Sequence, residues 1–249
     1  MKHKPETWES VWKRNRSRNG LLHRAGRKLA AYGDLQRLVL DILKKNCRID
    51  RNTRILEAGC GTGPVAGRLT GLTSLVYGID ISPTATELTK DTGVKTAVAD
   101  ARQLPFRDGT FDLVYSTGVV DLFNDTQAAV ILKEIVRVTE TGGRIVVITA
   151  WSGCRIHETV KKYLIRRRRW RYGPKRTFKT LEHLLPSESR LVGEHAMGAL
   201  FQFRFLSYLF EEKKLARRLY HLVYLLFSIL LWPLNRLPGA VLVTIVEKE

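Results

Sequence analysis

The stretch Ile55-Leu-Glu-Ala-Gly-Cys-Gly-Thr-Gly63 decides the fold, because it joins a short apolar run to a loop of alternating glycines. The apolar run predicts a buried strand, and the loop leads from it into a helix. Alternating glycines let the chain turn sharply and let backbone N–H groups approach a ligand without a Cβ in the way. Asp80 ends the next apolar run, where a carboxylate can accept hydrogen bonds from both hydroxyls of a ribose. Together these features predict a site for an adenosine-type cofactor.

Short apolar runs alternate with stretches of helical length on both sides of this loop. The apolar runs are 53–58, 75–80, 95–99, 111–116 and 144–150, and the stretches of helical length include 35–43, 83–90 and 126–139. Such alternation predicts βαβ units and a mostly parallel α/β sheet with helices on both faces. Right-handed crossovers place the carboxyl ends of the strands on one edge, where ligands bind.

The composition indicates one folded domain with two basic attachments. The chain has 249 residues, of which 44% are hydrophobic and 27% charged, which excludes a disordered or collagen-like protein. Lys and Arg outnumber Asp and Glu by 42 to 24. Residues 1–54 carry 15 basic and 5 acidic side chains and residues 155–183 carry 11 and 2, whereas residues 55–154 carry 8 and 11. The two basic segments therefore predict an anionic partner, either nucleic acid or an acidic membrane surface.

Cysteine usage and the amino-terminal residues predict the cellular compartment. Cys47, Cys60 and Cys154 form neither a C-x-x-C pair nor a spacing typical of zinc ligands, so no disulfide framework and no metal site is expected. Residues 1–19 are polar and basic and lack the apolar core of a secretory signal. We expect a cytoplasmic protein, with peripheral attachment to a membrane as a further expectation.

Five motifs in chain order carry a resemblance to a known family. Their residues are Ile55–Gly63, Gly78-Ile-Asp80-Ile-Ser82, Ala99-Asp100-Ala-Arg-Gln-Leu-Pro105-Phe106, Phe111-Asp-Leu-Val-Tyr-Ser116 and Ile135-Val-Arg-Val-Thr-Glu-Thr-Gly142-Gly143. The loop reads G-x-G-x-G after an acid, unlike the G-x-G-x-x-G fingerprint of dinucleotide sites. In this pattern the chain resembles the class I S-adenosylmethionine-dependent methyltransferases, within the small-molecule group that includes ubiquinone- and menaquinone-type enzymes. The resemblance implies a Rossmann-like, seven-stranded sheet whose last strand is antiparallel.

That resemblance also implies S-adenosyl-L-methionine as the cofactor and assigns residues to it. Glu57 and the glycine loop would hold the amino-acid end, Asp80 the ribose, and Asp100 with Ala101 the adenine amino group. Ser116 or Thr117 would line the methyl-transfer cavity. The full cofactor-binding set is Glu57, Gly59, Cys60, Gly61, Gly63, Asp80, Ile81, Asp100, Ala101 and Ser116.

Each of these assignments has a local structural alternative. The glycines could serve only as turns, Asp80 could cap the next helix, and Asp100 could make an Asx-turn. Asp121 stands where many quinone- and sterol-type relatives carry a histidine, and it is the candidate general base. Its alternative role is a negative charge at the start of the following helix.

A dense cationic run follows the predicted fifth strand, where the family usually builds its substrate-covering region. The residues proposed to contact substrate, membrane or nucleic acid are Arg166, Arg167, Arg168, Arg169 and Trp170. Aromatic and arginine side chains together can stack on bases, or meet lipid phosphates at a bilayer surface. A solvated charged helix is the alternative. The amino-terminal residues Trp8, Val11 and Trp12 lie beside basic residues in the same way, as in an amphipathic interfacial helix.

A long apolar segment, Leu219–Leu234, precedes the predicted last strand at 239–248. It is shorter than the about 20 residues that a membrane-spanning helix needs. A segment that is apolar on all sides must be covered by protein, by a partner subunit or by part of a bilayer. Flanking arginines and internal Tyr and Trp favour a segment that dips into a membrane surface. A core helix, or an interface that forms a homodimer through this apolar insertion, is the alternative.

The sequence thus predicts one domain in four parts. These are a basic helical segment at 1–52, a cofactor-binding α/β core at 53–154, a basic substrate-covering region at 155–188, and the last two strands at 189–249 with an apolar insertion at about 206–237. The predicted function is methylation of a lipophilic small molecule, such as a quinone, isoprenoid or lipid precursor, at or near a membrane surface. An RNA methyltransferase and a non-catalytic cofactor-binding partner subunit are the alternative functions.

Overall fold

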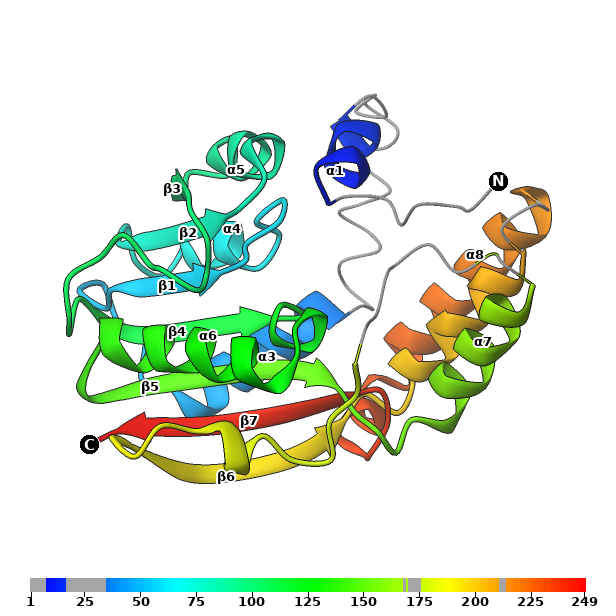
Figure 1. The fold of residues 1–249 in the computed structure, drawn as a ribbon. Helices are drawn as coiled ribbons and strands as arrows, with labels where there is room; N and C mark the ends of the chain where they lie inside the picture. Colours follow the sequence, from blue (N-terminus) through cyan, green and yellow to red (C-terminus); the bar gives the residue numbers. More distant parts are fainter. Residues whose placement is uncertain (1–7, 17–34, 168, 170–175, 211–213) are drawn as a thin grey trace.

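The computed structural model describes residues 8–16, 35–167, 169, 176–210 and 214–249 (Figure 1). Within these residues the chain forms a seven-stranded sheet with the order β3-β2-β1-β4-β5-β7-β6. The strands are β1 (Ile55–Ala58), β2 (Val76–Asp80), β3 (Lys95–Val98), β4 (Phe111–Thr117), β5 (Thr139–Ala150), β6 (Ser189–Met197) and β7 (Val241–Lys248). Strand β7 runs antiparallel to both of its neighbours, and the remaining pairs are parallel. The predicted α/β fold with an antiparallel last strand is confirmed.

Helices cover both faces of the sheet, also as predicted. The helices associated with the sheet are α3 (Leu35–Asn46), α4 (Ala66–Leu69), α5 (Pro83–Lys90) and α6 (Asp125–Val138). Helices α3 and α4 share one buried cluster with side chains such as Ile55 and Leu113, and α6 shares the other with side chains such as Leu56 and Val114. Because neighbouring residues of a strand point to opposite faces, each central strand contributes to both cores.

The cofactor edge of the sheet lies at the carboxyl ends of β1, β2 and β4. Strand β1 pairs with β2 on one side and with β4 on the other, so the strand order reverses beside it. Ligands of open α/β sheets bind at such a reversal, outside the carboxyl ends of the strands. The glycine loop and Asp80 both lie at this edge, since they follow β1 and end β2.

A helical cover adjoins the same edge of the sheet. Helix α7 (Arg155–Arg166) follows β5, and the 3₁₀ helix η3 (Phe201–Phe210), α8 (Lys214–Leu230) and the 3₁₀ helix η4 (Trp232–Arg236) lie between β6 and β7. Ala150 and Met197 both pair with Val241, so β5 and β6 end at one level and both lead into the cover. Figure 1 shows α7 and α8 extending beyond the sheet on this side.

Packing and hydrogen bonds join the elements of the cover to each other. The buried ring of His157 lies 4.4 Å from the Phe205 ring, which joins α7 to η3. The Tyr220 hydroxyl donates a 2.5 Å hydrogen bond to the Phe203 carbonyl, which joins α8 to η3. The cover is therefore built from segments that lie apart in the sequence.

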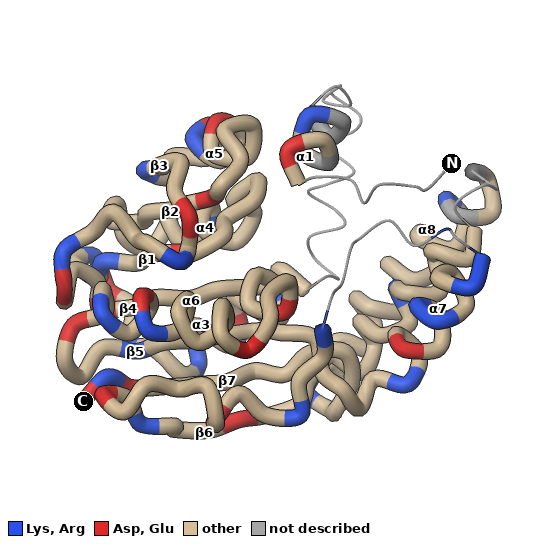
Figure 2. The backbone as a smooth tube through the Cα atoms, viewed as in Figure 1, with Lys and Arg blue, Asp and Glu red and all other residues tan. Residues whose placement is uncertain are grey.

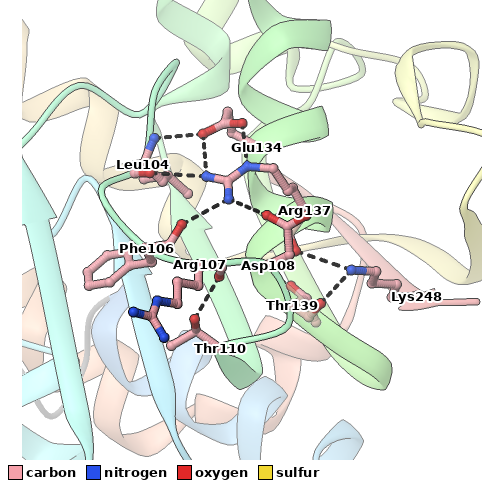
Figure 3. A network of polar contacts seen from close by, with 9 residues as sticks. All are labelled: Leu104, Phe106, Arg107, Asp108, Thr110, Glu134, Arg137, Thr139 and Lys248. Atoms are coloured by element: carbon pink, nitrogen blue, oxygen red, sulfur yellow. Dashed lines mark hydrogen bonds and ion pairs between the residues drawn. The ribbon is translucent and has the colours of Figure 1, made fainter.

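Arg137, at the end of α6, holds the loop that follows β3 (Figure 3). Its guanidinium donates to the carbonyls of Leu104 and Phe106 at 3.0 and 2.8 Å. It also pairs with Asp108 at 2.6 Å and with Glu134 at 2.7 Å. Because this loop carries Asp100 and Ala101, Arg137 positions one side of the candidate site.

We expect Arg137→Met to lower the free energy of unfolding by about 2–3 kcal/mol, since it leaves two carbonyls and two carboxylates without their charged donor. Urea unfolding measures this change. Arg107→Met is the matched control, because the Arg107 side chain is exposed and points away from this network (Figure 3). Equal stability of the two variants would contradict the assigned role.

Candidate active site

The glycine loop adopts a conformation that only glycine accommodates at its first turn. Gly59 has φ +83° and Gly61 has φ +55°, in the left-handed region. A Cβ at Gly59 would lie 2.1 Å from Cγ2 of Val119, which belongs to the segment after β4. The loop after β1 and the segment after β4 are therefore in close contact at the cofactor edge.

The N–H groups of this loop bond within the protein, in contrast to the prediction that they face a ligand. Gly59 and Cys60 both donate to the Ile79 carbonyl at 2.8 Å, and Gly61 donates to Oδ2 of Asp80 at 2.9 Å. Among the described residues, none donates a hydrogen bond to the Gly59 carbonyl. That carbonyl is suited to accept a hydrogen bond from the ammonium of an amino-acid ligand.

Asp80 and Ile81 combine a carboxylate with an apolar surface. The Asp80 carboxylate accepts a second hydrogen bond, from Ser82 N–H at 2.9 Å. Burial raises the pKa of Asp80, while the N–H groups of Ser82 and Gly61 favour its ionised form. Ile81 is 62% exposed. A carboxylate can bind ribose hydroxyls and an exposed apolar side chain can contact a base, so the pair fits a nucleoside.

Glu57 immediately precedes the glycine loop on β1, and one of its carboxyl oxygens has no hydrogen-bond partner among the described residues. It is buried on β1 opposite Tyr115 of β4, and its Oε2 has no hydrogen-bond partner among the described residues. Burial raises the pKa of Glu57 to about 8, although the Tyr115 hydroxyl and the Ala66 N–H favour the ionised form. Cys60 is buried too, and burial raises the pKa of its thiol to about 12, so it stays protonated rather than nucleophilic.

The Glu57→Gln variant should gain stability relative to the parent protein as the pH rises from 5 to 8. The unfolded carboxyl ionises near its ordinary pKa of 4.5, whereas the folded carboxyl keeps its proton up to about pH 8. The folded parent thus binds more protons than the unfolded chain in this interval, and its stability falls as the pH rises. Urea unfolding of both proteins at pH 5 and pH 8 tests this, and a difference independent of pH would contradict it.

Asp100 and Ala101 lie on the loop that Arg137 holds. The Asp100 carboxylate is paired with Arg102 at 2.6 Å, and this partner lowers the pKa of Asp100. Ala101 is buried in the core beneath. An adenine amino group at this position would share the Asp100 carboxylate with Arg102. The sequence did not indicate that the two side chains pair.

Ser116 and Thr117, at the end of β4, differ in what their hydroxyls do. The buried Ser116 hydroxyl donates to the Ala58 carbonyl at 2.8 Å and so joins β4 to β1. Thr117 is only partly buried, and its Oγ1 has no hydrogen-bond partner among the described residues. Of the two residues predicted to line the methyl-transfer cavity, Thr117 is thus the one whose hydroxyl, although shielded from solvent, has no protein partner among the described residues.

The structure buries Asp121 completely. Its Oδ2 accepts a hydrogen bond from the Ala150 N–H at 3.2 Å, and its carbonyl accepts one from the Arg176 N–H at 2.7 Å. Asp121 therefore joins the segment after β4 to the end of β5 and to the cover. A role as general base stays a prediction for this fully buried carboxylate.

The predicted contact residues of the cationic run are only partly described. Arg166 and Arg167 are exposed at the end of α7, and Arg169 is partly buried. The Arg167 guanidinium lies 5.5 Å from the centre of the Tyr163 ring. Arg168 and Trp170 lie outside the described residues. The predicted contact of this run with a substrate, membrane or nucleic acid stays a prediction.

Helix α1 (Trp8–Arg16) lies next to the site, which the sequence did not reveal. The Glu9 carboxylate accepts hydrogen bonds from the hydroxyls of Ser82 and Thr84, beside Asp80. The Trp12 ring lies against Gly61, 3.1 Å from where a Cβ of that residue would be. The spacing of Trp8 and Trp12 indicated a helix with an aromatic face, but it did not show whether this face contacts the protein or a membrane.

Comparisons with known proteins agree with this geometry. Residues 56–147 match the family described as methyltransferase domain. The chain is 42% identical to a 2-methyl-6-phytyl-1,4-hydroquinone methyltransferase of Synechocystis over 106 residues, 40% of this chain and 32% of the relative. It is 36% identical to a demethylmenaquinone methyltransferase of Staphylococcus aureus over 110 residues, 41% of this chain and 45% of the relative. The matches thus span less than half the length of these curated relatives.

Solved structures show the same fold. The magnesium protoporphyrin IX methyltransferase of Synechocystis, with bound S-adenosylhomocysteine, has a TM-score of 0.58 at 13% identity, covering 86% of this chain and 82% of the other. The family match, the fold and the five motifs agree. Residues 56–147 therefore belong to a class I S-adenosylmethionine-dependent methyltransferase domain. Its cofactor is S-adenosylmethionine.

The residues of the site suit this cofactor. Asp80 and Ile81 would hold the ribose and the base, and the Gly59 carbonyl would accept from the amino-acid ammonium. Glu57 adds a buried acceptor without a partner under the same loop. When bound, the cofactor supplies an electrophilic methyl group on a sulfonium, whose positive charge is favoured by nearby carboxylates.

Proposed function

We propose that the chain transfers a methyl group from S-adenosylmethionine to a lipophilic small molecule, such as a quinone, isoprenoid or lipid precursor, at or near a membrane surface. The observation that carries the proposal is an exposed apolar face on α8, next to the edge of the sheet that holds the cofactor loop. The names of the two quinone-type relatives support the same substrate class.

The apolar face is one continuous stripe along α8. We call it the α8 face. Its residues are at least half exposed: Leu215, Leu219, Leu222, Val223, Leu226, Phe227 and Leu230. Leu230 is 76% exposed and Leu226 54%. Apolar patches of this kind on a protein surface mark contact with another protein, a ligand or a membrane.

Trp232 and Tyr220, near this face, are engaged with the protein in the described structure. The Trp232 indole donates to Asp41 of α3 at 3.1 Å, and Arg37 lies 4.3 Å from its ring centre. Tyr220 bonds to η3 and contacts the Phe210 ring. Leucines with Val223 and Phe227, rather than Tyr or Trp, therefore form the surface that could enter a bilayer.

Exposed cations on α7 and on α8 itself support an anionic membrane surface as the partner of the α8 face. Lys and Arg are frequent along α7, whereas α8 carries few charges (Figure 2). Arg155, Lys162 and Arg166 of α7 are exposed, as is Arg218 of α8. Each cation near an anionic bilayer contributes about 1 kcal/mol, so a few of them with partial burial of leucines suffice for reversible docking. In the described part of the chain, no helix has the length and hydrophobicity needed to cross a membrane.

The chain's own residues would act by positioning rather than by covalent chemistry. Methyl transfer from a sulfonium is an in-line displacement, so alignment of acceptor and methyl group can supply much of the rate. The glycine loop and Asp80 would fix the cofactor, and Thr117 would line the cavity at the end of β4. The helical cover would exclude water and admit an apolar acceptor from the membrane side.

A fractionated extract tests the proposed substrate class. The purified protein is incubated with methyl-labelled S-adenosylmethionine and with the lipid or RNA fraction of a cell extract. We expect label in the lipid fraction. Label in RNA would instead favour the RNA methyltransferase, with the cationic run of α7 as its binding surface. Cofactor binding without label in either fraction would favour a non-catalytic partner subunit.

A further inference from the structure

Helix α1 is attached to the cofactor site through one carboxylate. Oε1 of Glu9 accepts a hydrogen bond from Thr84 Oγ1 at 2.6 Å, and Oε2 accepts one from the Ser82 hydroxyl. These two hydroxyls hold the pKa of Glu9 down at about 2, so it is ionised throughout the neutral range. Lys13, one turn further along α1, lies 3.4 Å from the same carboxylate. The described part of α1 packs mainly on α5, beyond the sheet (Figure 1).

The two hydroxyls that Glu9 engages belong to the residues after Asp80. Ser82 and Thr84 are both buried, and Ser82 also accepts a hydrogen bond from the Ala85 N–H at the start of α5. Ser82 N–H donates to Asp80 as well. Ser82, which binds Glu9 of α1, is therefore also hydrogen-bonded to Asp80, the carboxylate assigned to the ribose.

The same helix reaches the glycine loop through Trp12. A Cβ on Gly61 would lie 3.1 and 3.2 Å from two atoms of the Trp12 ring, so this ring is in van der Waals contact with the loop. The Trp8 ring stacks on Trp12 with centroids 5.9 Å apart. One short helix therefore contacts both the Asp80 segment and the glycine loop.

We propose that Glu9 is a positioning residue that fastens α1 over the bound cofactor, so that Trp12 closes the site above Gly61 and slows cofactor release. An aromatic ring at this position excludes water from the cofactor edge beside Gly61. The inference rests on the proposed function only in requiring that the cofactor binds; it is independent of the acceptor.

Stopped-flow tryptophan fluorescence, with S-adenosylhomocysteine as the probe, measures the release directly. We expect Glu9→Gln and Thr84→Val each to accelerate dissociation about tenfold, because each weakens or removes a charge-assisted hydrogen bond, with association unchanged. The double variant should accelerate release by less than the product of the two single effects, since both changes act on the same contact. Trp12→Ala should also release the probe faster. Glu188→Gln is the charge-matched control, because Glu188 is exposed near β6, remote from the site.

The outcomes separate this inference from the proposed function. If the parent protein binds the probe and Glu9→Gln releases it at the parent's rate, the fastening role of Glu9 is wrong. Tighter binding by Glu9→Gln or Trp12→Ala would also overturn it, because α1 would then obstruct the site. If neither the parent nor the variants bind the probe, the proposed function fails together with the inference. A thermal unfolding midpoint equal to the parent's excludes a general loss of structure in the variants.

Discussion

Asp80→Asn is expected to weaken the binding of S-adenosylhomocysteine by about 100-fold, because charge-assisted hydrogen bonds to the two ribose hydroxyls lose their anionic acceptor. The carboxylate also accepts hydrogen bonds from the N–H groups of Gly61 and Ser82. An asparagine amide would place a donor against one of these N–H groups, which disturbs the loop as well. Isothermal titration calorimetry measures the loss of affinity.

Asp91→Asn is the matched control for Asp80→Asn. Asp91 is exposed at the carboxyl-terminal end of α5, so its substitution removes the same charge without touching the loop. We expect this control to bind S-adenosylhomocysteine as the parent does. Undiminished affinity in Asp80→Asn would show that Asp80 only caps the following segment, the structural alternative that the sequence left open.

Replacing Leu226 and Leu230 together with aspartate should reduce binding to anionic vesicles by about 100-fold. The change removes two apolar side chains from the α8 face and adds two negative charges beside an anionic surface. Both leucines are more than half exposed, so the substitutions should leave the fold intact. Vesicle sedimentation at low and high salt measures the effect, and salt should weaken the parent's binding.

Leu72→Asp controls for the introduction of a charge at an exposed leucine, since Leu72 lies after α4 and outside the α8 face. It should sediment with vesicles as the parent does. Sedimentation of the double variant at the parent's level would contradict a membrane role for α8. Conversion of a parental dimer to a monomer in the double variant, without vesicle binding by the parent, would identify the α8 face as a homodimer interface.

The sequence predicted the sheet and the cofactor edge because both depend on local patterns. The apolar run before Gly59 and the carboxylate at Asp80 mark strand ends directly, and the alternation in 239–248 marks the last strand, observed at Val241–Lys248. Which hydroxyl at the end of β4 has no partner among the described residues could not be predicted. The bond from Ser116 to the Ala58 carbonyl joins residues 58 positions apart, and only the packing of β4 on β1 creates it.

Contacts between residues far apart in the sequence also determine the surroundings of α1 and α8, which local patterns could not predict. The pattern of Trp8 and Trp12 is equally compatible with a bilayer and with a protein surface, and the partner of Glu9 is 73 positions away at Ser82. In α8 the apolar residues surround the helix, so periodicity does not distinguish the exposed leucines from the covered side chains. Packing against η3 decides this, as the contact between Tyr220 and Phe203 shows.

The most direct test compares methyl transfer to a lipid extract presented in anionic vesicles and in detergent. Our account predicts that the parent labels the lipid in both forms. The Leu226→Asp and Leu230→Asp double variant should label it only in detergent while binding S-adenosylhomocysteine normally. Absence of label from the lipid in both forms, in a parent protein that binds the cofactor, would contradict a lipophilic acceptor.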